Sequence, residues 1–271
     1  MKRFLSAVAC LGYAYLCLVG DGTAAPMQNE EEAEDYRILR EIIAMEFSDE
    51  TPHEWGAAVS GVKTRLKTEE KVIALGLDAC DPEGRRDSLN LLRALELEGV
   101  PVTLFVCGDW IDRNAAVFKK IAANPLFEIG NQGLARRPCS VNGRSIGTVP
   151  GTRSVEELFA EIEKNARKIE AMTGTLPQYY HAGTGYYDEV AVRIVNALGY
   201  DAVGSELRLP EGTALTREEV FEALMSPAAG AIAVLQPLTL GRATSEAVLE
   251  SVRRLKTKGY KFVKLSDFPL E

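Results

Sequence analysis

Histidine is rare in this sequence, and its scarcity limits the metal chemistry that the chain can do. Only His53 and His181 occur among the 271 residues, and they lie 128 positions apart. Zinc sites built on a helical histidine pair need two histidines one turn apart. Such sites are therefore excluded, whereas a metal held by one histidine together with carboxylates or thiolates is not.

Short apolar, β-branched runs alternate with amphipathic stretches of helical spacing along most of the chain. Runs that are apolar throughout are typical of parallel strands, which are buried on both faces. The predicted strands are residues 72–78, 102–107, 127–131, 178–182, 202–204, 231–236 and 261–265. The predicted helices are residues 86–98, 112–123, 154–173, 187–198, 216–225 and 244–258.

This alternation predicts an α/β domain with a parallel sheet and right-handed crossovers. We expect a barrel, because the 246 residues that follow position 25 are close to the roughly 250 of a single α/β barrel. An open doubly wound sheet is the alternative, but no Gly-x-Gly-x-x-Gly follows the first strand, so nothing supports dinucleotide binding. In both architectures the functional side chains gather at the carboxyl ends of the strands.

Asp78 ends a predicted buried strand, where a carboxylate needs a hydrogen-bonding or charged partner. It is either a base or sugar-hydroxyl acceptor, or a carboxylate paired with Arg136 or His181. His181, at another strand end, is either a general base or lone metal ligand, or a hydrogen-bonded histidine that fills space. These alternatives leave Asp78 and His181 as the candidates for catalytic residues.

A group of three residues that follows the fourth predicted strand can also contact a ligand. Tyr186, Tyr187 and Asp188 either line a sugar site, since aromatic rings stack on pyranose faces, or serve the helix that follows. In the second interpretation Asp188 supplies the negative charge that a helix N-terminus favours.

The N-terminus has the pattern of a secretory signal peptide. Lys2 and Arg3 precede an apolar run from Phe4 to Val19, and small residues end the segment at Ala25. The run is shorter than the roughly 20 residues that span a bilayer, so an uncleaved anchor is the less favoured alternative. We therefore predict a signal peptide over residues 1–25 and a periplasmic or extracellular, envelope-associated mature chain without a transmembrane span.

We expect residues 26–54 to form a partly helical N-terminal arm and residues 55–271 to form the barrel. The chain carries 31 basic and 39 acidic residues, a formal net charge of −8. Loss of the leader, which holds two basic residues and one acidic residue, makes the charge −9. An acidic exported protein has no electrostatic basis for binding nucleic acid or anionic lipid, so neither is an expected partner.

Three cysteines, Cys80, Cys107 and Cys139, remain after removal of the leader. An odd number in an oxidising compartment allows at most one internal disulfide and leaves a spare thiol. Cys80 and Cys139 lie on predicted loops of the same face. A disulfide, or two unpaired thiols, is favoured there over a metal site of two cysteines and an aspartate.

Several ordered segments between about Trp55 and Asp267 resemble the polysaccharide deacetylases of the NodB-homology, or carbohydrate esterase 4, family. Residues 77–80, Leu-Asp-Ala-Cys, resemble the branch whose first motif reads Thr-Phe-Asp-Ala-Cys, and residues 102–110 are similar to the family strand Ala-Thr-Leu-Phe-Val-x-Gly-x-Trp. Further similar segments follow at residues 127–131, 138–145, 183–189 and 230–236. The resemblance implies a distorted (β/α)7 TIM-like barrel in a single domain.

The resemblance also implies a hydrolase that acts on non-peptide carbon–nitrogen bonds. The family removes acetyl groups from sugars with a divalent metal, which polarises the carbonyl group and activates water. In its pattern an aspartate and a His-x-x-x-His pair hold the metal, another aspartate is the base, and a late-strand histidine is the acid. On this chain Asp78 matches the base and Ala79 the metal-ligand aspartate. The histidine pair falls on Gln132 and Arg136, and the late-strand histidine falls on Gln236.

These replacements remove the chemistry that the resemblance implies. A glutamine amide such as Gln132 is a poor zinc ligand, and Arg136 has no lone pair and stays positively charged. Gln236 cannot transfer a proton, so the general acid is lost. His181 stands where the family pattern has the arginine that orients the base. We therefore expect no cofactor and a degenerate active site.

The sequence as a whole predicts an exported, deacetylase-like protein that binds a glycan or peptidoglycan fragment, or an envelope protein, instead of hydrolysing acetyl groups. The candidates for ligand binding are Gln132, Arg136, Tyr186, Tyr187, Asp188 and Gln236. The alternative is an active carbohydrate or peptidoglycan deacetylase with a rearranged site around Asp78 and His181, which would use a divalent metal such as zinc. A structural envelope protein with a vestigial cleft is a third interpretation.

Overall fold

The computed structural model describes residues 25–80, 86–207, 216–235 and 242–271. The chain divides into two compact units, of which the smaller ends at Leu39 and the larger runs from Arg40 to Glu271. Helix α1 (Ala25–Phe47) begins in the first unit and ends in the second, where Ile43 and Phe47 are buried. Among the described residues, no helix is both long and apolar enough to span a bilayer.

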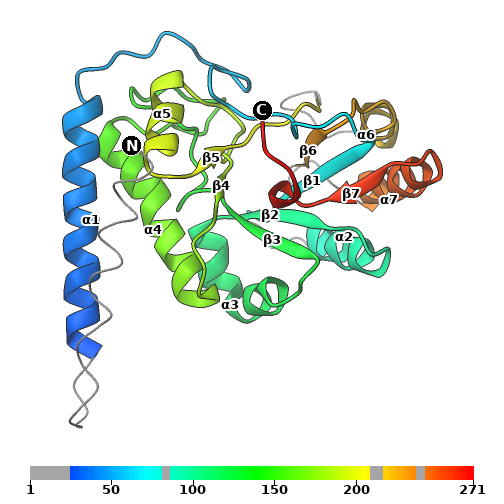
Figure 1. The fold of residues 1–271 in the computed structure, drawn as a ribbon, viewed down its shortest axis with the longest axis horizontal. Helices are drawn as coiled ribbons and strands as arrows, with labels where there is room; N and C mark the ends of the chain where they lie inside the picture. Colours follow the sequence, from blue (N-terminus) through cyan, green and yellow to red (C-terminus); the bar gives the residue numbers. More distant parts are fainter. Residues whose placement is uncertain (1–24, 81–85, 208–215, 236–241) are drawn as a thin grey trace. The chain divides into compact units, whose positions relative to one another are not determined.

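The larger unit is built on a parallel sheet. Its strands within the described residues are β1 (Val72–Asp78), β2 (Val102–Val106), β3 (Phe127–Asn131), β4 (Tyr179–Tyr180), β5 (Asp201–Ala202), β6 (Ala231–Leu235) and β7 (Lys261–Val263). The strand order is β5-β4-β3-β2-β1-β6, and β7 pairs with β1 outside this path (Figure 1). All these pairings are parallel, as the apolar runs predict.

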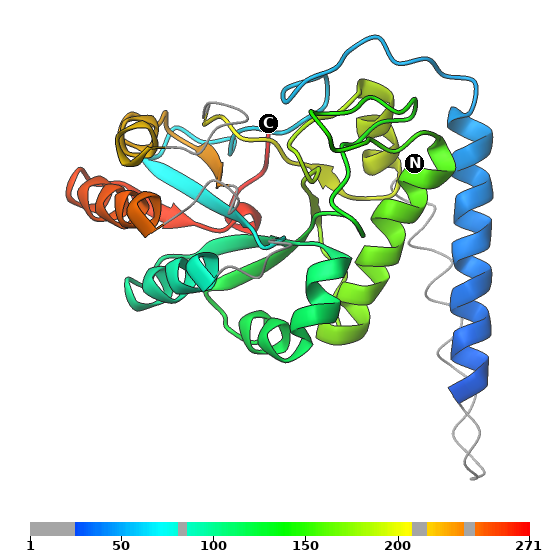
Figure 2. The same ribbon diagram turned by 180° about the vertical axis from the view of Figure 1, so that it is seen from behind.

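The two ends of this strand order are joined by an extended segment, residues 63–66. The Lys63 N–H donates to the Ala202 carbonyl of β5 at 2.7 Å, and the Leu66 N–H donates to the carbonyl of Gly230, next to β6, at 2.7 Å. The sheet is therefore curled into a half-barrel instead of lying open (Figure 2). This confirms the predicted (β/α)7 TIM-like barrel.

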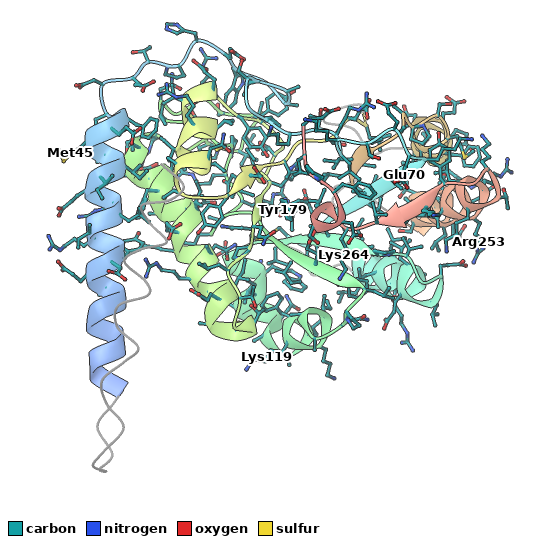
Figure 3. All side chains as sticks on the ribbon, in the orientation of Figure 1. Met45, Glu70, Lys119, Tyr179, Arg253 and Lys264 are labelled. Carbon is teal, nitrogen blue, oxygen red and sulfur yellow. A yellow bond between two sulfur atoms is a disulfide. The ribbon has the colours of Figure 1, made fainter. Side chains whose placement is uncertain are left out.

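Six helices in the described part alternate with the strands. They are α2 (Arg86–Leu97), α3 (Gly108–Ala122), α4 (Val155–Thr173), α5 (Glu189–Ala197), α6 (Arg217–Leu224) and α7 (Arg242–Thr257). Helix α6 packs on α7 and α7 on α2, while α4 packs on both α3 and α5. Charged side chains such as Lys119 of α3 and Arg253 of α7 point outward from the helices (Figure 3).

Alternation along β1 determines which side chains face the inside of the half-barrel. Ile73 and Leu77 pack in the larger core cluster, which also contains side chains of α2, α3 and α7. Val72 and Ala74 pack instead in a second cluster with Phe105 and other side chains of the curled sheet. Successive side chains of a strand point to opposite faces, so Asp78 belongs to the face of residues 72 and 74.

The largest difference at a predicted helix start is found at α3. Helix α3 begins at Gly108, earlier than residue 112, because the Cys107 carbonyl accepts hydrogen bonds from Trp110 and Ile111 at 3.1 Å. Helix α4 begins within one residue of its predicted start: the Ser154 side chain caps it by accepting from the Glu157 N–H, while the Glu157 carboxylate binds arginine side chains.

Candidate functional site

Asp78 lies at the carboxyl end of β1 and is 3% exposed. Burial raises the pKa of its carboxyl group, and His181, the Gln132 amide and the Arg136 charge lower that pKa but do not fully offset burial. The Gln132 amide interacts with the carboxylate, yet no hydrogen bond of normal length joins them. Asp78 Oδ1 thus has no hydrogen-bond partner within the described residues.

His181 follows β4 and faces the same carboxylate. Its Nδ1 lies 2.7 Å from the Val203 carbonyl oxygen. Because a carbonyl only accepts, we assign the hydrogen to Nδ1, which leaves the lone pair of the neutral ring on Nε2. Nε2 lies 3.9 Å from Asp78 Oδ1, too far for a hydrogen bond, and it has no other partner in the described part. Asp78 and His181 are therefore together, but they are not directly bonded.

Tyr187 holds the backbone around His181. Its hydroxyl donates to the Val203 carbonyl at 2.7 Å and accepts from the Ala182 N–H at 2.7 Å, and the residue is fully buried. Tyr187 thus supports the backbone around His181 from the protein interior. Tyr186, next to it in the chain, is only half-buried.

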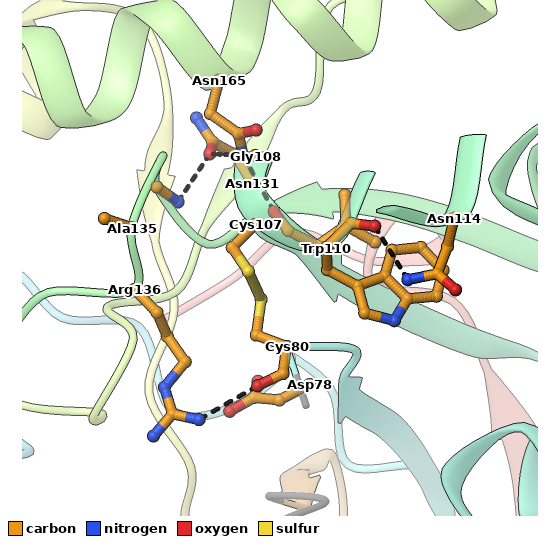
Figure 4. Close-up of a disulfide and its surroundings, with 12 residues drawn as sticks. Asp78, Cys80, Cys107, Gly108, Trp110, Asn114, Asn131, Ala135, Arg136 and Asn165 are labelled. Atoms are coloured by element: carbon orange, nitrogen blue, oxygen red, sulfur yellow. Dashed lines mark hydrogen bonds between the residues drawn. A yellow bond between two sulfur atoms is a disulfide. The ribbon is translucent and has the colours of Figure 1, made fainter. Parts of the chain in front are cut away.

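Gln132 and Arg136 lie on the loop that follows β3. Gln132 is fully buried, and neither atom of its amide has a hydrogen-bond partner among the described residues. Arg136 has a φ of 59°, and no other non-glycine residue in the described part has a positive φ. Its guanidinium donates to the Cys80 carbonyl at 3.1 Å, which places a fixed positive charge beside Asp78 (Figure 4).

Glu161 of α4 fixes the backbone on both sides of Arg136. Its Oε1 accepts from the Ala135 N–H at 2.9 Å and from the Arg137 N–H at 3.2 Å. A Cβ atom at Gly133, whose φ is 81°, would lie 2.5 Å from the same oxygen. The glycine and the buried carboxylate together impose the left-handed conformation of Arg136, which sequence reasoning did not anticipate.

Asn131 joins the end of β3 to α4 and β2. Its side chain donates to the Ile162 carbonyl at 2.9 Å and accepts from the Gly133 N–H at 2.8 Å. Asn165 donates to Asn131 Oδ1 at 2.7 Å and to the Val106 carbonyl at 2.8 Å (Figure 4). The signal that could have revealed Glu161 and Asn165 is their position, one helical turn apart, among the apolar residues of α4.

A disulfide joins Cys80 and Cys107, and Cys139 is a free, buried thiol. Both alternatives for Cys80 and Cys139, a disulfide between them or two unpaired thiols, are therefore wrong, because Cys80 pairs with Cys107. The register explains the difference: Asp78 pairs with Phe105 in the β1–β2 ladder, so the cysteines two residues further along each strand meet. Burial raises the pKa of the Cys139 thiol well above its usual value, which makes it a poor nucleophile.

Asp188 serves the fold at this end of the sheet. Its Oδ1 accepts from the Ala191 N–H at 2.7 Å as the N-cap of α5, and its Oδ2 accepts from the Val141 N–H at 2.8 Å. The side chain is fully buried. This matches the helix-capping interpretation of Asp188. Gln236, the remaining candidate, lies outside the described residues.

These residues do not fit the divalent metal that the family resemblance implies. The described part contains no group of three or more histidine, cysteine, aspartate or glutamate side chains that could hold a metal. The guanidinium of Arg136 instead lies beside the Asp78 carboxylate, and the neighbouring Gln132 offers only a neutral amide. A positive charge fixed beside the carboxylate opposes the binding of a second cation.

The fold and the site define a class: an α/β half-barrel with a buried carboxylate–histidine pair at the carboxyl ends of its parallel strands. Residues 65–203 match the family model described as polysaccharide deacetylase, and the chain therefore belongs to the polysaccharide deacetylase family. A search of curated proteins gives no match.

Solved structures of family 4 carbohydrate esterases have the same fold. A Bacillus subtilis member, PdaA, is 19% identical with a TM-score of 0.63, over 84% of this chain and 87% of that one. A family pseudoenzyme from Bacillus anthracis is 20% identical with a TM-score of 0.63, over 78% of this chain and 69% of that one. A mutant of this kind of pseudoenzyme, described as having restored enzymatic activity, is 21% identical with a TM-score of 0.62, over 78% of this chain and 72% of that one.

Proposed function

We propose that this protein is an exported glycan-binding member of the polysaccharide deacetylase family that does not hydrolyse acetyl groups by metal catalysis. In this proposal residues 1–25 are a cleaved leader and residues 55–271 form the binding domain in the cell envelope. One observation carries the proposal. The guanidinium of Arg136, aimed by its left-handed backbone, lies beside Asp78 and donates to the Cys80 carbonyl.

The charge and donor set of the site support the loss of metal chemistry. Arginine has no lone pair to coordinate a metal, and its positive charge persists at any accessible pH. Gln132 contributes only a neutral amide oxygen, which is a weak ligand for zinc beside imidazole. Asp78 and His181 would remain as the only strong ligands of this group, fewer than the three protein ligands of a catalytic zinc site.

The same site has the hydrogen-bonding capacity to bind a sugar. Asp78 Oδ1, His181 Nε2 and both amide atoms of Gln132 lack partners within the described residues. Buried polar atoms in native proteins are almost always satisfied, by protein, water or ligand. Hydroxyl and acetamido groups both donate and accept hydrogen bonds, so a sugar substituent or a water that bridges to it can satisfy these four atoms.

Thermal unfolding of the mature protein tests the binding activity. We expect acetylated chito-oligosaccharides to raise the melting temperature saturably, equally with and without a chelator, because a ligand that binds only the native state stabilises it. Stabilisation that needs added zinc would contradict the proposal. No stabilisation by any glycan would leave the envelope-protein interpretation.

The second candidate is a deacetylase with a rearranged site, and the Asp78–His181 pair is the observation that favours it. The lone pair on His181 Nε2, 3.9 Å from Asp78 Oδ1, is available to take a proton from a water molecule. This candidate predicts acetate release from acetylated chito-oligosaccharides that His181→Gln abolishes. Equal, background rates of acetate release from the wild type and this variant would exclude it.

A further inference from the structure

We propose that Trp55, Tyr186 and Arg144 form an aromatic platform that binds a pyranose ring of a glycan chain beside the Asp78 site. The inference rests on the proposed function in one respect, that the ligand is a glycan. It adds a second contact surface, and its key residue, Trp55, lies outside the part of the chain that matches the family model.

Backbone pairing brings the two aromatic rings together. Gly56 and Tyr187 form an antiparallel bridge, in which the Gly56 N–H donates to the Tyr187 carbonyl at 3.1 Å and the Tyr187 N–H donates to the Gly56 carbonyl at 2.9 Å. Their chain neighbours Trp55 and Tyr186 consequently lie side by side, with ring centroids 5.8 Å apart and planes inclined by 46°. Two segments more than 100 positions apart thus build one aromatic surface.

A third segment supplies the cation. The Cys139 N–H donates to the Tyr186 carbonyl at 3.0 Å, which fixes the loop after β3 against the same backbone. From this loop, the guanidinium carbon of Arg144 lies 5.9 Å from the ring centroid of Trp55. The Arg144 N–H donates to the Ser140 hydroxyl at 3.2 Å, so its backbone is held in place while the side chain extends over the indole.

The exposure of these side chains distinguishes the platform from the core. Trp55, Tyr186 and Arg144 are all half-buried, whereas the other tryptophan, Trp110, is 4% exposed and packs edge-on against Phe118. Two adjacent, partly exposed aromatic rings offer apolar surface that the C–H face of a pyranose can cover. The adjacent guanidinium can donate to hydroxyl or carboxylate oxygens of the sugar.

The platform is connected to the site through the backbone. Tyr186 immediately precedes Tyr187, whose hydroxyl holds the Val203 carbonyl that binds His181 Nδ1. Tyr186 is therefore one residue along the chain from the side chain that supports His181.

Tryptophan fluorescence tests the inference directly, because the chain has only two tryptophans. In the full mature chain, Trp110→Phe leaves Trp55 as the only tryptophan, so emission excited selectively at the indole reports on Trp55 alone. Titration with the pentasaccharide of N-acetylglucosamine should shift its emission saturably. In otherwise wild-type protein, Trp55→Ala and Tyr186→Ala should each weaken binding of the pentasaccharide about tenfold by calorimetry. Trp55→Leu repeats the test with apolar volume kept and the flat ring lost.

Phe221 provides a matched control, since Arg254 lies over its ring at 4.9 Å in a similar aromatic–arginine pair on α6 and α7. Phe221→Ala should leave binding unchanged. Pentasaccharide binding that survives all three platform variants at full affinity would overturn the platform and leave the proposed function standing. No binding by the wild type would overturn both.

Discussion

Burial of Asp78 disfavours its ionised carboxylate by more than the neighbouring groups favour it. The pKa of its carboxyl group is raised by burial, although His181, the Gln132 amide and the Arg136 charge act in the opposite direction. Neither charged neighbour is bonded closely enough to offset burial. His181 Nε2 lies 3.9 Å from Asp78 Oδ1, and the Arg136 guanidinium donates to the Cys80 carbonyl. The Asp78 carboxyl group is therefore protonated more readily than an exposed aspartate.

We predict that Asp78→Asn melts at the same temperature as the wild type, or higher, near neutral pH. A carboxyl group whose pKa is raised in the folded state contributes stability below its usual pKa of 3.8, and this is lost as pH rises through the raised value. The advantage of the variant should therefore shrink as pH falls. Melting curves across this pH range check the prediction, and a variant less stable at neutral pH would instead indicate a stabilising ion pair.

Replacement of Glu161 should show that it positions Arg136. Glu161→Leu leaves the buried N–H groups of Ala135 and Arg137 without an acceptor, and we expect a loss of about 2 kcal/mol or more in the free energy of unfolding. Glu161→Gln keeps an oxygen at this position and should lose less. Urea denaturation measures both values, and a leucine variant as stable as the glutamine variant would contradict this role.

Among the secondary-structure elements, the long buried strands were the most predictable. The apolar runs of β1 and β3 end at Asp78 and Asn131, where the predicted strands also end, because the sequence turns polar at those positions. Strands β4 and β5 are only two residues long, shorter than predicted. The neighbouring extended chain pairs instead with the distant segment 63–66, as in the bridge between Lys63 and Val203, which no local pattern reveals.

The site was predictable where it depends on strand ends, and unpredictable where it depends on contacts between distant elements. The positions of Asp78 and His181 follow from the alternation of strands and helices. The left-handed backbone of Arg136 does not, because it requires a carboxylate from α4, and neither does the Cys80–Cys107 pairing, which requires the β1–β2 register.

Helix capping provides a prediction at the level of the element. Ser154 caps α4, the helix that carries Glu161, and Thr216 caps α6. Replacement of either side chain by alanine should lower the free energy of unfolding by about 1 kcal/mol, since a helix N–H loses its acceptor. Ser154→Asp keeps an acceptor and serves as the control. Urea denaturation in which Ser154→Ala matches the wild type would contradict the capping geometry.

For the whole molecule, the disulfide links the ends of two adjacent strands of the half-barrel. Cys80 and Cys107 are separated by 27 residues, and their bridge lies next to Asp78 and the carbonyl group that binds Arg136. It therefore constrains both the unfolded chain and the carboxyl edge of the sheet. The wild type should depend on oxidising conditions for much of its stability.

We expect the double variant Cys80→Ser, Cys107→Ser to lose about 3.5 kcal/mol in the free energy of unfolding, the chain-entropy value for a loop of this length. The wild type should lose a similar amount when a reductant is added, and the double variant should not respond to it. Urea denaturation with and without reductant makes the comparison. A reductant effect that persists in the double variant would show that another group is responsible.

The proposed absence of metal catalysis is tested most directly by elemental analysis of the purified mature protein, together with an assay of acetate release. We predict less than stoichiometric zinc, cobalt or nickel, and no acetate released from acetylated chito-oligosaccharides, because the positive charge of Arg136 and the neutral amide of Gln132 lie beside Asp78. One equivalent of metal per chain, with acetate release that a chelator abolishes, would contradict the account.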